Sequence, residues 1–317
     1  MPASVLLAYA TVSLVWGSTY LAIRIGVQHL PPALFGGIRF VTAGALLFLA
    51  ARLSGQRLPA RARDWRTAAI VGVLLLTFGN GVVIWAEQFV ESGMAAVLVV
   101  TGALWMAVLD ALIPGSEAKP TAAQFLALAS GFGGVVLLVA VSGAPLGAAG
   151  ALGPVGLVAA SGSWALGSIY AKRNPSEASP YMNAALQMLA GGGSLLAVGV
   201  VAGEAAEIRF SWEGFGAIAY LIVFGSLVAY TSYVYLLKHA SAAFIGTHGY
   251  VNTVVAVLLG WLILDEHVNA LTFVAVGVVL GSVVWVRRAR RAAPVLAAPP
   301  AASAPSAPSE RSHRRRQ

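Results

Sequence analysis

Ten stretches of this chain are apolar over about 20 residues each, which is the length that an α-helix needs to cross the hydrocarbon core of a bilayer. They lie at residues 4–27, 32–51, 67–87, 93–113, 121–141, 150–171, 180–203, 213–236, 242–264 and 268–287. Only 10% of the 317 residues are charged, whereas a soluble domain carries about 25%. The chain therefore has too few charges to cover a water-soluble surface. The sequence predicts an all-α membrane protein with ten transmembrane helices.

The basic residues indicate how these helices are oriented. Short loops that carry Lys and Arg stay on the cytoplasmic side of a membrane. With the N-terminus inside, 17 of the 20 basic residues fall in inner loops or in the C-terminal tail, and only Arg209 falls outside. We therefore expect both termini to be cytoplasmic.

The two halves of the sequence repeat one another at an offset of 148 residues. Trp16 corresponds to Trp164, and Pro32 corresponds to Pro180. Further pairs at this offset are Arg24 and Lys172, Arg39 and Gln187, and Gly133 and Gly281. Each half holds five predicted helices, an odd number, so the second half enters the membrane from the opposite side. The predicted domains are thus two inverted five-helix repeats, residues 4–141 and 150–287, an arrangement typical of secondary transporters.

The last residues, 288–317, differ from the membrane body. The segment from 287 onward holds eight Arg and one Glu among many Pro, Ala and Ser residues. Such a composition cannot bury enough apolar area to fold, so we predict a disordered cytoplasmic tail. We interpret its Arg clusters as an anchor on anionic lipid in preference to a nucleic-acid site.

Enzyme signatures are absent from the sequence. The chain has no Cys, which excludes disulfides, thiolate metal sites and a Cys nucleophile. Motifs of metalloproteases, serine hydrolases and P-loop NTPases are missing as well. We therefore predict no enzymatic activity, no metal site and no cofactor.

Three ionisable residues within the apolar stretches are candidate functional groups, because a charge in hydrocarbon is costly unless it is paired or faces water. Arg39 is either a structural cation or a substrate or coupling residue. Glu87 is either a desolvated proton-coupling carboxyl or a solvated interfacial one. His248 is either a packing residue or a proton carrier. Asp265 and Glu266 follow the ninth stretch, and we interpret both as solvating an outer loop.

Polar and aromatic residues within the helices indicate the wall of a wet cavity. Trp16, Trp105 and Trp164 fall near mid-membrane, away from the interfaces where aromatic belts form. His248 and Asn252, four residues apart, share one helical face. The predicted cavity residues are Trp16, Ser18, Asn80, Trp85, Gln88, Thr101, Trp105, Trp164, Tyr250 and Asn252.

A second kind of pattern concerns helix packing. Gly277 and Gly281 form a GxxxG motif in the last helix, matched at Ala129 and Gly133 in the fifth. Small residues at this spacing let helices approach closely, either within one chain or between two chains of a homodimer.

Three segments carry a resemblance to a known family. The strings WGSTYLAIRIGVQHLPPALFGGIRFVTAGALLFL, GNGVVIWAEQFVESGMAAVLVVTGALW and YVNTVVAVLLGWLILDEHV resemble EamA-type members of the drug/metabolite transporter superfamily. The resemblance covers residues 5–286 and implies ten helices in two inverted repeats around a central cavity. By the same resemblance, Ser18 and Trp85 join the cavity residues. Ala103 and Thr253 stand where relatives often have proline, so the kinks expected there lack their usual cause.

The expected function is transport of a small organic metabolite, such as an amino acid or a drug, across the cytoplasmic membrane. Alternating access, an outward direction and protons as coupling ion are the specific hypotheses. A passive facilitator of the same fold and a non-transporting membrane interaction protein are the alternatives. The expected partners are a small-molecule substrate and membrane lipid, and no nucleic acid.

Overall fold

The structure is a computed structural model that describes residues 2–112, 122–141, 148–240, 248–266 and 269–292. Throughout these ranges the regular secondary structure is helical. Six of the described helices are long and apolar enough to cross a membrane, and four shorter apolar helices accompany them. The start of the predicted helix at 242–264 and most of the predicted tail lie outside the described residues. The count of ten transmembrane helices stays a prediction.

The described helices follow the predicted apolar stretches. In chain order they are α1 (Ala3–Val27), α2 (Pro32–Leu53), α3 (Ala62–Gly72), η1 (Val73–Gly81), α4 (Val82–Ala86), α5 (Ser92–Val99), α6 (Gly102–Leu112), α7 (Ala122–Val141), α8 (Ala148–Arg173), α9 (Pro180–Val201), η2 (Glu204–Ala206), α10 (Trp212–Tyr220), η3 (Leu221–Val228), α11 (Ala229–His239), α13 (His248–Leu264) and α14 (Ala270–Ala292). α3, η1 and α4 are consecutive parts of one long span, and so are α10, η3 and the start of α11.

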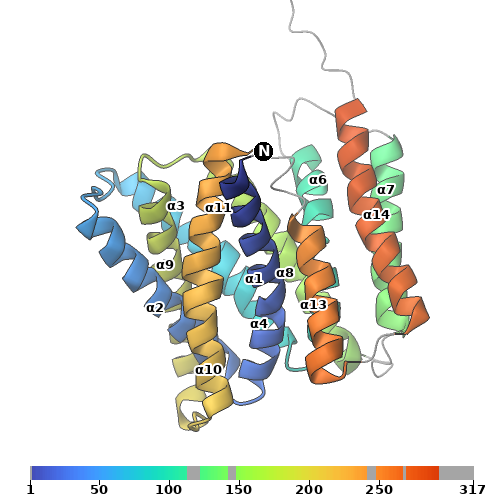
Figure 1. Cartoon of the computed structure of the whole chain (residues 1–317), viewed down its shortest axis with the longest axis horizontal. Helices are drawn as coiled ribbons and strands as arrows, with labels where there is room; N and C mark the ends of the chain where they lie inside the picture. The colour runs from blue at the N-terminus through green and yellow to red at the C-terminus, as the bar shows by residue number, and fades with distance from the viewer. Residues whose placement is uncertain (1, 113–121, 142–147, 241–247, 267–268, 293–317) are drawn as a thin grey trace, which may run out of the picture.

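Helices at equivalent positions of the two halves pack against each other. α2 and α9 begin 148 residues apart, each at a proline, a residue that suits the first helical position because it needs no hydrogen-bond partner for a backbone N–H. These two helices pack together on one side of the bundle, at the left of Figure 1, and α7 and α14 form a second such pair on the opposite side, at the right. Such pairing is expected of two inverted repeats, which stay a prediction.

A π-helical segment interrupts the third helix of each half. η1 begins at Val73 and η3 begins at Leu221, again 148 residues apart. π-helices are rare and occur frequently at functional sites. The first helix of each half packs on the π-helix of the other half, α1 on η3 and α8 on η1.

The fourth helix of the first half is broken in the middle. α5 ends at Val99 and α6 begins at Gly102, although Ala103 stands where a proline would supply the usual cause of a kink. Two short-range bonds tighten the turn between them, from Thr101 N to Leu98 O at 3.1 Å and from Ala103 N to Val100 O at 3.1 Å. In the second half, α13 runs through Thr253 without a break.

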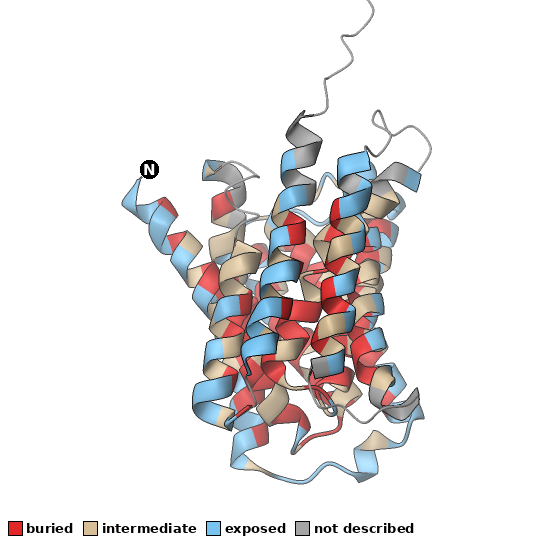
Figure 2. Ribbon diagram, turned by 90° about the vertical axis from the view of Figure 1, so that its right-hand side faces the viewer, coloured by how far each residue is buried: buried red, intermediate tan, exposed pale blue. Residues whose placement is uncertain are grey.

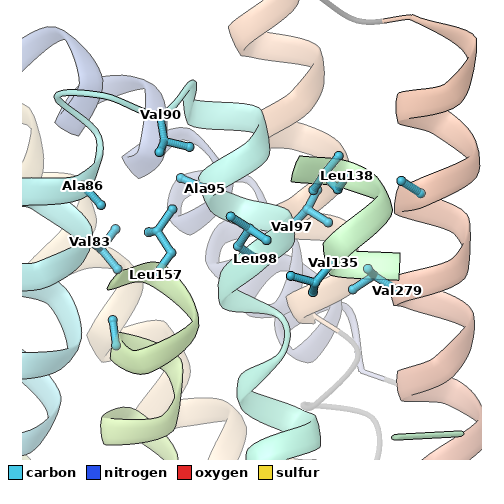
Figure 3. Packing of buried hydrophobic residues seen from close by; sticks show 12 residues of the cluster. Val83, Ala86, Val90, Ala95, Val97, Leu98, Val135, Leu138, Leu157 and Val279 are labelled. Atoms are coloured by element: carbon cyan, nitrogen blue, oxygen red, sulfur yellow. The ribbon is translucent and has the colours of Figure 1, made fainter. Parts of the chain in front are cut away.

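Buried residues occupy the centre of the bundle, and exposed ones cover its outside (Figure 2). The largest apolar cluster joins α4, α5 and α8 to α7 and α14, with Leu98 and Leu157 fully buried in it (Figure 3). Many large apolar side chains are exposed, including Leu7, Phe125 and Leu262. Such a surface suits contact with lipid.

The predicted GxxxG motif does not pack within the described part of the chain. A Cβ added at Gly277, Gly281 or the equivalent Gly133 would meet no atom within 4 Å. The α7–α14 contact uses other glycines, because a Cβ at Gly134 would lie 2.9 Å from the Val278 side chain and one at Gly131 would lie 3.1 Å from the Ser282 Cβ. Contact of the motif with another chain stays a prediction.

The first residues of α1 and the last described residues of α14 lie at the same end of the bundle (Figure 1). We call this the terminal end. The α1–α2 connection and the start of α5 lie at the opposite end, which we call the distal end.

Candidate functional site

The predicted cavity residues of the first helix lie against η3. Trp16 Nε1 donates to Gly225 O at 3.0 Å, and the hydroxyls of Ser18 and Tyr220 are 2.6 Å apart. The Trp16 ring also contacts the rings of Tyr233 and His248, with centroids 5.2 and 5.3 Å away. We call this group the α1 cluster; its members are Trp16, Ser18, Tyr220, Tyr233, His248 and Asn252.

His248 and Asn252 connect α13 to α1, as expected from their shared face. The Asn252 amide lies 3.2 Å from His248 Nδ1. With the amide oriented to satisfy both of its ends, its nitrogen donates to Ser13 O at 2.8 Å. Tyr250 packs elsewhere, against the buried cluster that joins α6, α7 and α14. The polar group predicted on this helix is therefore divided between two faces.

A second group surrounds α8 and η1. Ser163 Oγ donates to Leu74 O at 2.8 Å, and Asn80 Nδ2 approaches Leu75 O at 3.4 Å. A Cβ on Gly79 would lie 3.2 Å from the ring of Trp164, which is 41% exposed. We call this group the α8 cluster; its members are Asn80, Trp85, Thr101, Trp105, Ser161, Ser163 and Trp164.

The remaining members of the α8 cluster tie α8 to its other neighbours. The hydroxyls of Thr101 and Ser161 are 2.8 Å apart, and Trp105 Nε1 donates to Val158 O at 3.0 Å. The Trp85 ring would lie 3.1 Å from a Cβ at Gly156. Thr101 lies at the break between α5 and α6, which places a hydroxyl where the helix is interrupted.

The two clusters occupy equivalent places in the two halves. In each, the first helix of one half donates a side-chain hydrogen bond to a backbone carbonyl in the π-helix of the other half, as Trp16 and Ser163 do. Tyr220, Tyr233, Ser161 and Ser163 were not among the predicted cavity residues. Their only signal was a hydroxyl within an apolar helix. That Trp16 and Trp164 face one shared cavity stays a prediction.

Arg39 is buried and incompletely bonded. Its side chain is 5% exposed, Nε lies 3.4 Å from Ser226 Oγ, and Nη1 has no hydrogen-bond partner among the described residues. Its guanidinium also lies 4.6 Å from the centroid of the Phe40 ring. A buried cation with so few partners is costly, and both alternatives for its role stay predictions.

Glu87 lies at the distal end of α4 and is fully buried. Neither carboxylate oxygen has a hydrogen-bond partner in the described part of the structure, and Arg24 donates to the backbone carbonyl of Glu87. Arg24, Arg39 and Glu266 are within electrostatic range of the carboxyl. The solvated alternative for this residue is wrong. Gln88, its neighbour, donates to Trp85 O at 3.0 Å and joins neither cluster.

The interpretation of Glu266 as a solvated loop residue is also wrong. Only 7% of the residue is exposed, and its carboxylate accepts hydrogen bonds from Ser92 N at 2.6 Å and Gly93 N at 2.9 Å. These amides begin α5, where unpaired N–H groups and the helix dipole favour an anion. Asp265, by contrast, is exposed as expected.

Comparison with known proteins establishes the family. The EamA-like transporter family matches the chain twice, over residues 3–140 and 151–288. The chain belongs to the EamA-like transporter family. This confirms the resemblance found in the sequence and makes the protein a multi-pass membrane transporter and not an enzyme.

Relatives of this EamA-family protein match over most of their length. The inner membrane transporter YedA of Escherichia coli is 39% identical over 277 residues, covering 86% of this chain and 87% of YedA. The transporter YoaV of Bacillus subtilis is 20% identical, covering 84% of this chain and 90% of YoaV. A solved crystal structure with 20% identity superposes with a TM-score of 0.61, covering 92% of this chain and 99% of that one. The last comparison supports the fold alone.

Proposed function

We propose that this EamA-family protein is a secondary transporter that exports a small organic metabolite by alternating access. The observation that carries the proposal is the pair of equivalent polar clusters, one around α1 and one around α8, each bonded to a π-helix of the opposite half. Transporter folds of this kind bind substrate near the membrane midplane, where two inverted halves meet. A transporter that alternates between two states needs matching surfaces in both halves, and the two clusters supply them.

The proposal includes the topology of the chain. Residues 4–141 and 150–287 form the two inverted repeats, and residues 288–317 form a cytoplasmic segment that contacts anionic lipid. The predicted disordered tail begins too early, because residues 288–292 continue α14. The terminal end of the bundle is cytoplasmic, and the distal end faces outward. The excess of Lys and Arg in the loops of the terminal end supports this orientation.

Trp16, Ser18 and Asn252 of the α1 cluster and Asn80, Thr101, Trp105 and Trp164 of the α8 cluster line the substrate pathway in this proposal. Each of these side chains combines an apolar body or neighbourhood with one hydrogen-bonding group. Such sites hold a small organic molecule by apolar contact and orient it with a few polar groups.

Release of metabolites from cells tests the transport function. Bacteria expressing the chain are compared with cells expressing a Trp16→Ala, Asn80→Ala variant, which removes one polar group from each cluster. We expect the wild-type chain to increase one or a few small metabolites in the medium and the variant to reduce this increase at least about tenfold. Trp212→Ala is the matched control, because Trp212 is exposed at the distal interface. Equal release by the wild-type chain and the double variant contradicts the proposed site.

Proton coupling is tested with the metabolite so identified. Glu87 and His248 are the candidate coupling residues. Glu87 is buried and its carboxylate has no hydrogen-bond partner among the described residues, and His248 contacts Trp16. In proteoliposomes, Glu87→Gln with His248→Ala removes the response of transport to a pH gradient. A wild-type response in this variant refutes the coupling role, and counterflow without any gradient dependence identifies a facilitator.

A further inference from the structure

The Glu266 carboxylate joins two helices that are far apart in the sequence. Glu266 follows the end of α13, whereas the amides that it accepts from, Ser92 N and Gly93 N, begin α5. α5 and α13 belong to the fourth helices of the two halves, and they pack against each other. The carboxylate therefore bridges the two halves at the distal end.

The surroundings of this carboxylate have no spare room. A Cβ at Gly260, one turn before the end of α13, would lie 2.7 Å from Glu266 Cδ and 2.9 Å from Ser92 Oγ. Asp265 adopts a left-handed backbone conformation with φ of 52°, which is costly for a residue with a side chain. This turn directs Glu266 back into the bundle while Asp265 stays at the surface.

α5 lies between two groups of helices. Its apolar residues, including Ala95 and Leu98, lie between α4 and α8 on one side and α7 and α14 on the other (Figure 3). The helix is only eight residues long and ends at the break before α6. A short helix with a break at one end moves independently of the rest of its span more readily than a continuous helix does.

We propose that Glu266 is a latch that holds the distal end of the transporter closed. While the carboxylate accepts the two amides of α5, α13 and α5 stay together and the distal entrance is shut. When the carboxylate leaves these amides, α5 separates from α13 and the distal end opens. The latch rests on the proposed alternating-access function and names the contact that must break in each cycle.

A second carboxylate provides a matched comparison. Glu204, in η2, accepts hydrogen bonds from Ala33 N at 3.2 Å and Leu34 N at 2.8 Å at the start of α2. It uses the same chemistry at the same end of the bundle, but it joins α2 to the connection after α9. α2 and α9 pack against each other along their length, so loss of the Glu204 hydrogen bonds frees only the first turn of α2.

The absence of Cys from the chain allows a direct accessibility test. Ser92→Cys places a thiol beside the latch at a fully buried position whose hydroxyl has no hydrogen-bond partner in the described residues. The purified variant in lipid nanodiscs, which expose both ends of the bundle, is treated with a water-soluble maleimide. The labelling rate is measured for three proteins: Ser92→Cys alone, which is the reference, Ser92→Cys combined with Glu266→Gln, and Ser92→Cys combined with Glu204→Gln. No substrate is required, so the result does not depend on transport.

We expect Glu266→Gln to increase the labelling rate at position 92 about tenfold, which corresponds to about 1.4 kcal/mol. Loss of charge from two hydrogen bonds that a carboxylate accepts is sufficient for such an effect. Glu204→Gln is expected to leave the rate within about twofold of the reference. A Glu266→Gln rate within twofold of the reference overturns the proposal, and so does an equal increase with Glu204→Gln.

A second reporter separates latch release from general loosening. Ala43 is fully buried on α2, in the contact with α9, and Ala43→Cys places the second thiol there. If Glu266→Gln releases only the latch, this thiol stays protected while the one at position 92 becomes reactive. Increased labelling at both positions shows that the substitution loosens the whole fold, which overturns the assignment of Glu266 as a latch.

Discussion

Two glycines on α9, two residues apart, are expected to respond in opposite ways to the same substitution. Gly191 faces the span formed by α3 and η1, where Thr77 Oγ1 donates to its carbonyl at 3.0 Å. A Cβ at Gly191 would lie 2.7 Å from Leu76 Cβ and closer still to the carbonyl oxygen of Gly72. A Cβ at Gly193 would meet no atom of the described residues within 4 Å. Of these two glycines, only Gly191 permits a close approach of helices.

The magnitude follows from these contacts. Ordinary contact begins at 3.4 Å, so the helices must separate by at least about 0.7 Å to accept a methyl group at position 191. Overpacking of this kind costs about 1–3 kcal/mol, whereas Gly→Ala within a helix gains about 1 kcal/mol from helix propensity. We expect Gly191→Ala to destabilise the protein by up to about 2 kcal/mol and Gly193→Ala to stabilise it by up to about 1 kcal/mol.

Thermal unfolding of the purified variants in detergent measures the difference. The two variants differ by the overpacking cost of about 1–3 kcal/mol, so at about 2 °C per kcal/mol, the low end expected for a chain of this size, their Tm values should differ by about 2–6 °C. Both substitutions add the same methyl group to the same helix, so changes in expression or detergent binding affect them alike. A Tm for Gly191→Ala at or above that for Gly193→Ala refutes the packing argument.

Three further predictions concern the charges, the α1 cluster and the exposed glycines. Arg39→Met replaces a buried, incompletely bonded cation with an apolar side chain of similar length, so Tm should stay the same or rise while metabolite release is lost. A fall in Tm of several degrees would identify a structural cation. Trp16→Phe removes the hydrogen bond to Gly225 O, which should cost about 1 kcal/mol and lower release severalfold, as measured by thermal unfolding and the export assay. Gly277→Leu and Gly281→Leu should leave Tm unchanged and abolish any homodimer seen by light scattering, and dimers that persist in both would place the interface elsewhere.

The helices were predictable because their causes are local. A helix in lipid satisfies its backbone hydrogen bonds within its own segment, so an apolar run of sufficient length determines it. The starts of α2 and α9 at Pro32 and Pro180 were predicted to the residue, since proline at the first helical position is a signal in the sequence itself.

The π-helices could not be predicted, because their sequences carry no contrast between polar and apolar faces. The segments VLLLTFGNG and LIVFGSLV are apolar almost throughout, and periodicity distinguishes helix types only where polar residues alternate with apolar ones. Without the π-helices as a guide, the sequence predicted the cavity residues as one group. The structure places most of them in two clusters, because each first helix packs on the π-helix of the other half.

Asp265 and Glu266 show a second limit. They are adjacent acidic residues after an apolar run, and the sequence gives no reason to treat them differently. Asp265 is exposed and Glu266 is buried because the left-handed backbone torsion at Asp265 turns the chain inward. The resulting hydrogen bonds reach residues more than 170 positions away, and no local pattern encodes such a partner.

The matched π-helices also bear on the history of the chain. A π-helix takes more residues per turn than an α-helix, so one that arose in a single half would have shifted the residues after it relative to the other half. The offset is 148 residues at Trp16 and Trp164, 147 at Trp65 and Trp212, and again 148 where the two π-helices begin, at Val73 and Leu221. From there to Gly133 and Gly281 it stays at 148 residues, so after this irregular turn begins neither half has gained or lost a net residue relative to the other.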